Sequence, residues 1–473
     1  MMAPPLAFVM EQISFGTGGW RATLDTFTDE RVRMVAQGVA TYLKETEEGR
    51  RVAVGYDARE RSEESAESIA EVLAANGFDV LLTDRDLPTP VLTYAIVDHD
   101  LAGAVMVTAS HNPPNYNGVK FVPGDTMSPL PEVTEAIEEN LASPTSVPES
   151  ERGNVTRFDP VPAHAERSVN LVGEYFDTDL SGLTVVYDAI HGSGRGVTDD
   201  LLEAAGAEVI RRRCDHDSQF GGVAPEPGPE TLAGLREAVV EHDADLGIGN
   251  DGDADRITVC TPDRGVLNGH LFFAGLYDAL LTDGDASGPA VRTVSTTFLI
   301  DRIADAHGEE VYEVPVGFKW VADGLKRHDG LLGGEESGGF TIRDHVGEKD
   351  GVLFALLAAA VTAAEPFDAR IDRLFETHGR IYADKRSVDC PEARKSAVIA
   401  ALEDEIPDAV AGQSVADVVT LDGFKLLLED GSWLLVRPSG TEPKLRVYAE
   451  STDAERLDEL LDAGRDLLES LLR

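Results

Sequence analysis

Cysteine is scarce in this chain of 473 residues. Only three occur, Cys214, Cys260 and Cys390, and they are widely spaced with no CxxC pair. A disulfide framework or a cysteine zinc site is therefore not expected. The same scarcity favours a reducing, cytoplasmic location.

Long hydrophobic runs are also missing. The longest apolar stretch, Gly351 to Ala364, stops at Glu365 and is shorter than the roughly 20 residues that a membrane-spanning helix needs. The first fifteen residues contain Glu11 and have no basic flank before their apolar part, so they do not resemble a secretory signal. We expect neither a membrane span nor a membrane partner.

Positive charge is in short supply. The chain has 41 Lys and Arg against 86 Asp and Glu, a formal net charge of -45. Because contacts to phosphate backbones and anionic lipids require cations, this balance excludes nucleic acid and acidic membranes as partners. The acid is spread along the whole chain, as expected of a protein adapted to concentrated salt, where surface charge is screened. An acidic enzyme of ordinary salt is the alternative, and in either case an anion site must supply its own local cations.

The length predicts three or four domains, and a repeated pattern predicts their class. Three times a helical stretch ends at a glycine and is followed by a short strand, at Gly77, Gly206 and Gly308. Glycine at such a point allows the left-handed conformation that ends helices. Apolar runs precede the three helices, at Val52–Tyr56, Leu183–Tyr187 and Val291–Thr297, and Ser62 is a candidate N-cap. Strand, helix and strand repeated in this way predict α/β domains with mixed, largely parallel sheets.

Composition suggests the domain boundaries. A stretch rich in Ser, Pro and charge, Ala142 to Pro162, is a predicted linker, and further breaks fall near Pro262–Gly265 and Glu365–Asp384. The C-terminal part has alternating apolar runs and an amphipathic helix from Asp453, which predicts a smaller α+β domain. The predicted domains are 1–155, 156–262, 263–376 and 377–473.

The first candidate loop follows an apolar strand and reads Thr108-Ala109-Ser110-His111-Asn112-Pro113-Pro114. The prolines keep the serine and histidine out of helix and strand. A hydroxyl held rigidly at a strand end can accept and return a phosphoryl group, although a structural Ser-His turn is the simpler interpretation of this segment alone. Lys120 follows within reach.

The second loop places three carboxylates at alternate positions, Asp251, Asp253 and Asp255, followed by Arg256. Such spacing can turn several oxygens toward one hard cation such as magnesium. Without a cation the three charges repel one another, so a metal site is favoured over an acidic turn. Arg256 is a candidate phosphate contact or the counter-ion of the loop.

Two further loops can recognise a sugar phosphate. In Gly334-Glu335-Glu336-Ser337-Gly338 the carboxylate of Glu335 and the hydroxyl of Ser337 point the same way if the segment is extended. The segment Arg437 to Arg446 combines cations, hydroxyls and an open glycine backbone into a candidate anion cradle. The segment from Phe15 through Arg21 likewise combines glycines, which allow close approach, with an arginine. It lacks the lysine of a nucleotide-binding P-loop, so nucleotide binding does not follow.

Together, and in this order, the four loops resemble the α-D-phosphohexomutase family of phosphoglucomutases and phosphomannomutases. The resemblance runs nearly end to end: TASHNP at 108–113, DGDADR at 251–256, GEESG at 334–338 and the phosphate loop at 437–446. Family membership implies three similar α/β domains and a smaller C-terminal α+β domain around a central cleft. It also implies an isomerase that transfers phosphoryl groups within hexose phosphates.

The resemblance further implies roles for individual residues. Ser110, phosphorylated in the active form, gives its phosphoryl group to a hexose monophosphate, and glucose 1,6-bisphosphate is the intermediate and activator. Mg²⁺ is held by Asp251, Asp253, Asp255 and an oxygen on Ser110. Lys120 is the proton shuttle, for which we expect neighbouring cations to lower its pKa. The other implied residues near the reaction are Arg21, His111 and His345; those implied in substrate binding are Arg256, Gly317, Lys319, Glu335, Ser337, Lys349, Arg437, Ser439, Gly440, Thr441 and Arg446.

Two segments bear on the sugar. Val314 to Lys319 resembles the P-T-G-W-K loop of the glucose-phosphate branch, and Asp344-His345 with Glu348-Lys349-Asp350-Gly351 resembles its D-H…E-K-D-G stretch. Glucose phosphates are therefore the expected substrates. Ala254 and the GEESGG sequence depart from the pattern of many glucose enzymes, which leaves a phosphomannomutase or a dual enzyme as the alternative and a phosphoglucosamine mutase as a more remote one.

Two other classes of function remain open at this point. A metal-dependent sugar phosphatase could use the Asp251-Gly252-Asp253 segment, but it would have no use for Ser110 or the cradle at Arg437. A non-catalytic phosphosugar-binding paralogue is disfavoured because every residue of the family's catalytic set is present.

Overall fold

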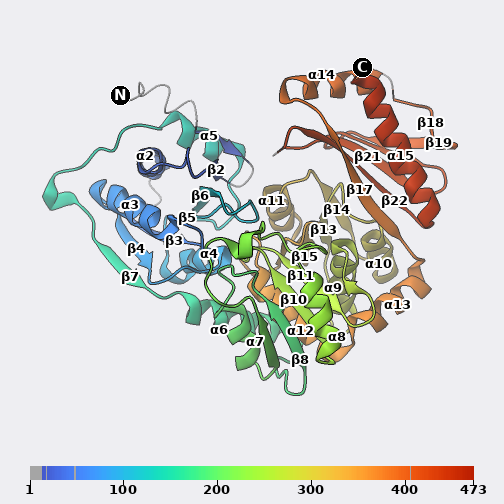
Figure 1. The fold of residues 1–473 in the computed structure, drawn as a ribbon, viewed down its shortest axis with the longest axis horizontal. Coiled ribbons are helices and arrows are strands. Elements are labelled where there is room, and N and C mark those ends of the chain that lie inside the picture. The colour runs from blue at the N-terminus through green and yellow to red at the C-terminus, as the bar shows by residue number, and fades with distance from the viewer. Residues whose placement is uncertain (1–12, 17–18, 47–48, 405, 441, 473) are drawn as a thin grey trace. The chain divides into compact units, whose positions relative to one another are not determined.

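The computed structural model describes residues 13–16, 19–46, 49–404, 406–440 and 442–472. These fall into two compact units. The first contains the chain to residue 269 with 279–286 and 337–368, and the second contains 270–278, 287–336 and the chain from 369. Figure 1 gives the order of the elements.

The N-terminal part of the first unit is built on a seven-stranded mixed sheet. The strand order is β1-β2-β6-β5-β3-β4-β7; β3, β4, β5 and β7 run parallel, and β1, β2 and β6 pair antiparallel. The strands are β1 (Phe15–Gly16), β2 (Gly19–Thr23), β3 (Arg51–Tyr56), β4 (Asp79–Thr83), β5 (Gly103–Val107), β6 (Tyr116–Pro123) and β7 (Val155–Phe158), and the helices are α2 (Asp29–Thr46), α3 (Ser62–Ala75), α4 (Thr89–His99) and α5 (Pro131–Glu139).

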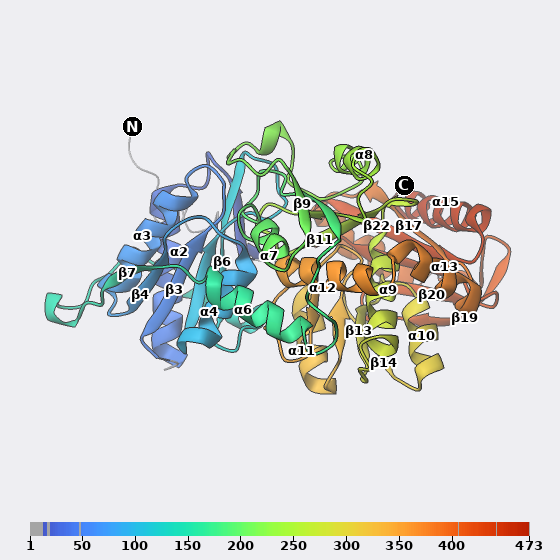
Figure 2. The ribbon, with the colours of Figure 1, turned by 90° about the horizontal axis from the view of Figure 1, so that it is seen from below.

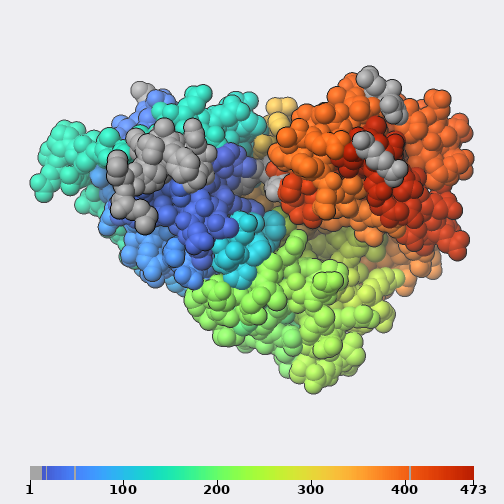
Figure 3. Space-filling view, turned by 45° about the horizontal axis from the view of Figure 1, so that its top comes forward, coloured from blue at the N-terminus to red at the C-terminus, as the bar shows by residue number. Residues whose placement is uncertain are grey.

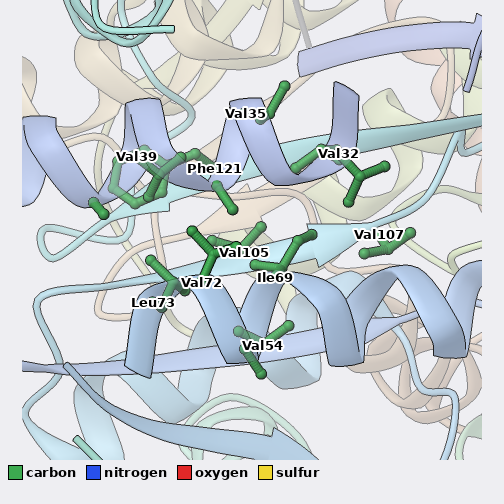
Figure 4. Close-up of a cluster of buried hydrophobic side chains, with 14 of the residues drawn as sticks. Val32, Val35, Val39, Val54, Ile69, Val72, Leu73, Val105, Val107 and Phe121 are labelled. Atoms are coloured by element: carbon green, nitrogen blue, oxygen red, sulfur yellow. The ribbon is translucent and has the colours of Figure 1, made fainter. Parts of the chain in front are cut away.

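Helices cover both faces of this sheet. On one face α2 and α3 pack branched side chains onto Val54 and Val105, as Figure 4 shows. Gly55, the next residue of β3, points at Leu92 of α4, whose Cδ2 would lie 3.0 Å from an added Cβ. Because successive strand residues face opposite sides, α4 covers the other face. The strand β5, which leads into the serine loop, thus lies between two packed layers.

Two expectations for this region need correction. Ser62 is the first residue of α3, not its cap: Arg61 is the capping residue, in the left-handed conformation, and the Ser62 hydroxyl donates to Asp57 instead. The predicted linker from Ala142 to Pro162 contains β7, which pairs with β4 as the last strand of the sheet. The part of the linker before β7 is largely exposed (turquoise in Figure 3).

A five-stranded sheet follows in the same unit, with the order β12-β11-β10-β8-β9. β8, β9 and β10 are parallel, and β11 and β12 return antiparallel. The elements are β8 (Thr184–Asp188), β9 (Glu208–Arg212), β10 (Leu246–Asn250), β11 (Ile257–Thr261), β12 (Gly265–Val266), α6 (Val161–Val172), α7 (Thr198–Ala204), α8 (Ala233–Glu241) and the short 3₁₀ helices η1 (Glu149–Glu151) and η2 (Phe220–Gly222). The acidic loop joins β10 to β11.

The apolar helix α12 (Gly351–Ala364) packs against α6 and α7 in the first unit, which Figure 2 shows from below. It is buried along most of its length, which accounts for the longest apolar run of the sequence. Among the described residues no single helix is long and apolar enough to cross a membrane; only α12 and α13 (Phe367–His378), taken together across a sharp bend, meet that test.

The second unit contains two sheets. In one, β13 (Ala290–Thr293) pairs in parallel with β14 (Val311–Val314) and β15 (Leu332–Gly334). The expected strand Val291–Thr297 is therefore shorter, because the chain turns after Thr293. The helices α10 (Leu299–His307) and α11 (Phe318–His328) belong to this region, α9 (Gly269–Thr282) is divided between the two units, and β16 (Phe340–Ile342) belongs to the first unit.

The C-terminal sheet is antiparallel, with the order β17-β22-β21-β20-β19-β18. Its elements are β17 (Tyr382–Asp389), β18 (Ala409–Val410), β19 (Gln413–Val419), β20 (Phe424–Leu428), β21 (Trp433–Pro438), β22 (Lys444–Ser451), α14 (Glu392–Asp404) and α15 (Ala454–Leu471). The predicted helix from Asp453 is confirmed as α15, and Asp453 is its capping residue, since its carboxylate accepts the Arg456 N–H at 3.0 Å. Both helices pack on the sheet.

The repeat in the sequence is confirmed. Gly77, Gly206 and Gly308 all have positive φ, at 93°, 104° and 75°, and each follows a helix and precedes a strand. Three α/β arrangements and an α+β C-terminal part agree with the predicted fold class.

Candidate active site

The serine loop of the first unit delivers a strained, buried serine. Ser110 follows β5, is 1% exposed and has a φ of 50°, a left-handed conformation that costs a residue with a side chain about 1 kcal/mol or more. Its hydroxyl donates to Asp251 Oδ2 at 2.8 Å. The predicted nucleophile and the predicted metal loop therefore meet, although they are 141 residues apart in the sequence.

The acidic loop forms a compact set of buried oxygens. One carboxylate oxygen from each of Asp251, Asp253 and Asp255 lies within 4.8 Å of the others. Asp253 Oδ1 and Asp255 Oδ1 are buried and have no hydrogen-bond partner among the described residues. Hard oxygens that lack partners and repel one another fit a divalent cation such as Mg²⁺.

The pKa values of these acids reflect the same repulsion between buried carboxylates. Burial, and then the charges of Asp255 and Asp253, raise the pKa of Asp251 well above its usual value. Burial acts in the same direction on Asp253 and Asp255, but Lys120, together with Thr89 at Asp253 and with Lys349 and Arg256 at Asp255, outweighs it. The pKa values of both acids are therefore lowered. Asp251 is thus the carboxylate whose charge is least compensated.

Lys120 lies on β6 and bridges two of the acids. Its Nζ donates to Asp253 Oδ2 and Asp255 Oδ2, both at 2.8 Å. Burial by itself lowers the pKa of Lys120, but the two carboxylates outweigh burial and the pKa is raised. The expectation of a lowered pKa was wrong because the nearest charges are anions rather than cations.

Three more cations approach this cluster. Lys349 Nζ lies 3.0 Å from Asp255 Oδ2, and Arg256 Nε lies 3.9 Å from Asp255 Oδ1. The backbone N–H of Arg256 also donates to Asp251 Oδ1 at 3.1 Å. Arg21 donates to Asn112 Oδ1 at 2.8 Å, on the serine loop. In the segment that leads to Arg21, Thr17 and Gly18 lie outside the described residues.

The two predicted histidines differ in placement. His111 Nδ1 lies 3.2 Å from Ser110 Oγ, and the charge of Arg256, burial and the charge of Arg21 lower its pKa, so the ring is neutral near pH 7. The side chain of His345 is fully buried, and its Nε2 lies 2.7 Å from Asp350 Oδ2. That same oxygen is 2.6 Å from His164 Nε2. The structure thus brings His111 to the serine and places His345 in a separate buried cluster.

In the second unit, the predicted sugar-binding segments meet at Glu335. Glu335 Oε1 accepts the Gly317 N–H at 3.0 Å, at the start of α11, where Lys319 lies 5.4 Å above the ring of Trp320. Glu335 and Ser337 do not share an extended segment, because the chain turns at 336–337. Ser337, which belongs to the first unit, is exposed.

The predicted phosphate cradle pairs two arginines. Arg437 and Arg446 are directly opposite each other on β21 and β22, where like charges destabilise a sheet unless they are neutralised. Asp422 Oδ2 accepts Arg437 Nε at 2.9 Å, and Glu442 accepts Arg446 at 2.5 Å. Gly440 is exposed with open space beside it, while Thr441 lies outside the described residues.

Several residues in contact with these loops were not predicted. Asp422 also accepts the Val316 N–H at 3.0 Å and thereby joins the cradle to the segment of Gly317. Buried Lys395 of α14 donates to the carbonyls of Ser439 and Glu442, both at 2.6 Å. Thr89 donates to Asp253 Oδ2 at 2.7 Å. Each comes from a distant segment without a motif, so the sequence carries no signal for it.

Comparison with known proteins agrees with this arrangement. Four models described as phosphoglucomutase/phosphomannomutase match the chain: α/β/α domain I at 12–147, domain II at 166–265, domain III at 268–378 and the C-terminal domain at 387–467. The fold and these matches define the protein as a phosphosugar mutase, an isomerase. The chain belongs to the phosphoglucomutase/phosphomannomutase family of the α-D-phosphohexomutase superfamily.

The relatives span almost the whole chain. A probable phosphoglucosamine mutase of Methanopyrus kandleri is 32% identical over 96% of this chain and 97% of its own. A phosphopentomutase and a phosphoglucomutase/phosphomannomutase of Thermococcus kodakarensis are each 32% identical over 97% of this chain and 98% and 99% of their own. Their names differ in the sugar, so these identities define the reaction class and not the substrate.

Solved structures agree in fold. That of a putative phosphomannomutase from Thermus thermophilus has a TM-score of 0.83 and 29% identity and covers 97% of this chain and 99% of its own. The N-acetylphosphoglucosamine mutase of Aspergillus fumigatus, solved with GlcNAc-6P and magnesium, has a TM-score of 0.60 and 15% identity and covers 99% of this chain and all of its own.

Proposed function

We propose that this enzyme interconverts hexose 1-phosphate and hexose 6-phosphate, with glucose phosphates preferred, through a phosphoserine at Ser110. The observation that carries the proposal is the 2.8 Å contact between the Ser110 hydroxyl and the buried aspartate cluster. A serine fixed against oxygens suited to Mg²⁺ can receive and return a phosphoryl group. A phosphatase that used the aspartates alone would not need the serine there.

The proposed transfer exchanges one phosphorus–oxygen bond for another. The bond between phosphorus and Ser110 Oγ breaks as phosphorus bonds to the free hydroxyl oxygen of the bound hexose monophosphate. Asp251, Asp253 and Asp255 would hold Mg²⁺, which would neutralise charge on the transferred phosphoryl group. The resulting glucose 1,6-bisphosphate reorients and returns its other phosphate to Ser110.

A proton must move from the sugar hydroxyl to Ser110 Oγ. Lys120, whose raised pKa keeps it an ammonium, would give a proton to the leaving oxygen and then take one from the hydroxyl, which leaves its charge unchanged over the cycle. Neutral His111, 3.2 Å from Oγ, orients the serine hydroxyl. His345 does not contact the serine, so any role in the reaction would be indirect, through its buried contact with Asp350.

Substrate recognition would divide among the remaining residues. Arg437, Ser439, Gly440, Thr441 and Arg446 would bind the phosphate that does not react, because opposed arginines favour an anion. Gly317, Lys319, Glu335 and Ser337 would bind the sugar, and Arg21, Arg256 and Lys349 the reacting phosphate. The preference for glucose rests on the resemblance of Val314 to Lys319 to the P-T-G-W-K loop and on the D-H…E-K-D-G resemblance.

One assay tests the proposal. Glucose 1-phosphate with Mg²⁺ and catalytic glucose 1,6-bisphosphate should give glucose 6-phosphate without free phosphate. Ser110→Ala should lose turnover, whereas Ser146→Ala, at an exposed serine, should retain it. Normal turnover of Ser110→Ala would overturn the phosphoserine, and release of free phosphate would favour a phosphatase.

The relatives support a second candidate, an amino-sugar substrate, because a 32% identical protein is named a probable phosphoglucosamine mutase. Parallel assays with mannose, glucosamine and ribose 1-phosphates rank the alternatives by kcat/KM. If glucosamine 1-phosphate exceeds glucose 1-phosphate tenfold, the glucose preference is wrong and the reaction class stands.

A further inference from the structure

One buried arginine gathers the backbone of the serine loop. The side chain of Arg59, just after β3, is fully buried. Its Nη2 donates to the carbonyls of Ser110 at 2.5 Å and Asn112 at 2.6 Å. Its Nη1 donates to the carbonyls of Pro113 at 2.9 Å and Tyr116 at 3.1 Å. A planar guanidinium with five donors is suited to holding several carbonyls at once.

The partner of this arginine holds the other side of the serine. Asp57 Oδ2 lies 3.1 Å from Arg59 Nε and accepts the Thr108 hydroxyl at 2.6 Å. The Thr108 oxygen in turn accepts the Ser110 N–H at 2.8 Å. The pair therefore reaches Ser110 from both directions, through its carbonyl by Arg59 and through its N–H by Asp57 and Thr108.

The serine needs such support. Its φ of 50° is unfavourable for a residue with a side chain, and the loop around it has no regular structure of its own. The Phe220 ring, 4.9 Å from Arg59 Cζ, packs on the guanidinium. Without the hydrogen bonds to its carbonyl and from its N–H, the backbone of Ser110 would relax toward negative φ, and Oγ would turn away from Asp251.

We propose that Arg59, together with Asp57, is a positioning residue for phosphoryl transfer: it holds Ser110 in the strained conformation that aims Oγ at the aspartate cluster. This inference rests on the proposed phosphoserine chemistry. The described partners of Arg59 are Asp57, the backbone of residues 110–116 and Phe220. Among the described residues, Arg59 has no hydrogen bond or ring contact with a residue assigned above to the sugar or the phosphate, and lysine at this position keeps its charge near Asp251, Asp253 and Arg21. Removal of the fork alone is therefore expected to change turnover and not the KM for hexose phosphate.

The test compares Arg59→Lys with Arg61→Lys. Lysine keeps the charge of Arg59 but cannot present a planar fork to four carbonyls. Arg61, two residues later, is half-exposed and donates to the Leu24 carbonyl instead, so it is the matched control. The measurements are the rate of Ser110 phosphorylation by glucose 1,6-bisphosphate, followed by intact mass, with kcat, KM and the melting temperature.

The expected result is a loss of at least about tenfold in both phosphorylation rate and kcat for Arg59→Lys, with KM within about twofold and Arg61→Lys like wild type. Asp57→Asn, which keeps the shape of the pair, should show the same split. A folded Arg59→Lys or Asp57→Asn enzyme that is phosphorylated at the wild-type rate overturns the proposal. So does a failure of both variants to fold, since the pair would then serve the fold alone. A wild-type enzyme that never forms phosphoserine refutes the proposed function instead.

Discussion

Replacement of Asp251 by asparagine should stabilise the metal-free protein. Asp251 is fully buried, and burial together with the charges of Asp255 and Asp253 raises its pKa well above the usual value. A carboxyl whose pKa is raised in the folded state loses stability as pH rises above its unfolded value near 4. The loss grows as the pH rises from the unfolded pKa toward the raised pKa of the folded state. Asparagine has the same shape without the charge.

The size of the effect follows from the spacing of the acids. Two unit charges separated by 4.8 Å, the outer limit for these oxygens, interact by about 3.5 kcal/mol at an effective dielectric constant of 20. Two acids oppose Asp251, while Arg256 and the Ser110 hydroxyl offset part of the repulsion. We expect a net gain of about 2 kcal/mol, or about 4–8 °C for a cooperative unit of 150–250 residues.

The assay is thermal unfolding at pH 7 with EDTA, repeated with Mg²⁺ at constant ionic strength. Wild type should gain about 2.7 kcal/mol at a Mg²⁺ concentration of 100 Kd, and Asp251→Asn should gain much less. Asp188→Asn is the control of opposite sign, because it removes the buried negative charge that pairs with Arg213 at 2.8 Å. If Asp251→Asn melts below wild type in EDTA, or if both respond equally to Mg²⁺, the reasoning fails.

Three further predictions concern charge elsewhere. Lys425 is buried between the rings of Phe298 and Trp433, 4.2 and 4.5 Å from their centroids; burial and then Arg292 lower its pKa to about 8. The unfolded state therefore binds more protons between pH 8 and 10.5, and wild type should gain about 3 kcal/mol of stability relative to Lys425→Met across that window; parallel curves from denaturant unfolding would contradict this. Asp422→Ala removes the link between Arg437 and the Val316 N–H, so KM for glucose 1-phosphate should rise about tenfold, while Asp417→Ala, at an exposed acid of the neighbouring strand, leaves KM unchanged. With a net charge of -45, the melting temperature should rise from 0.1 to 1 M KCl as the Debye length falls from about 10 to about 3 Å; a constant or falling value would count against salt adaptation.

The parts of this protein that local sequence determines were predictable. The glycines at 77, 206 and 308 end helices because only the local φ matters. The serine and acidic loops were recognisable because each carries its chemistry within ten residues. Their meeting at 2.8 Å followed from the family resemblance rather than from either loop alone.

What could not be predicted depends on contacts between distant segments. Asp57 and Arg59 form an ordinary acid-base pair in the sequence, and only the packing of β3 beside β5 places them under Ser110. The direction of the Lys120 pKa shift was mispredicted for the same reason, since its two carboxylate partners lie more than 130 residues away. Lys395 and Asp422 likewise contact the phosphate loop from other elements.

The whole chain is strongly negative, whereas several cations gather around Ser110. The two facts are compatible because the cations lie close to the aspartates. Close to Ser110 the aspartates are matched by Lys120, Lys349 and the arginines at 21 and 256, so the cluster carries little net charge before a cation binds. A divalent cation would then leave the cluster positive. Because screening limits the reach of the acidic surface to about a Debye length, a phosphate dianion that enters this region meets local cations rather than the field of the whole protein. We therefore expect salt to favour both the stability of the acidic fold and the approach of an anionic substrate.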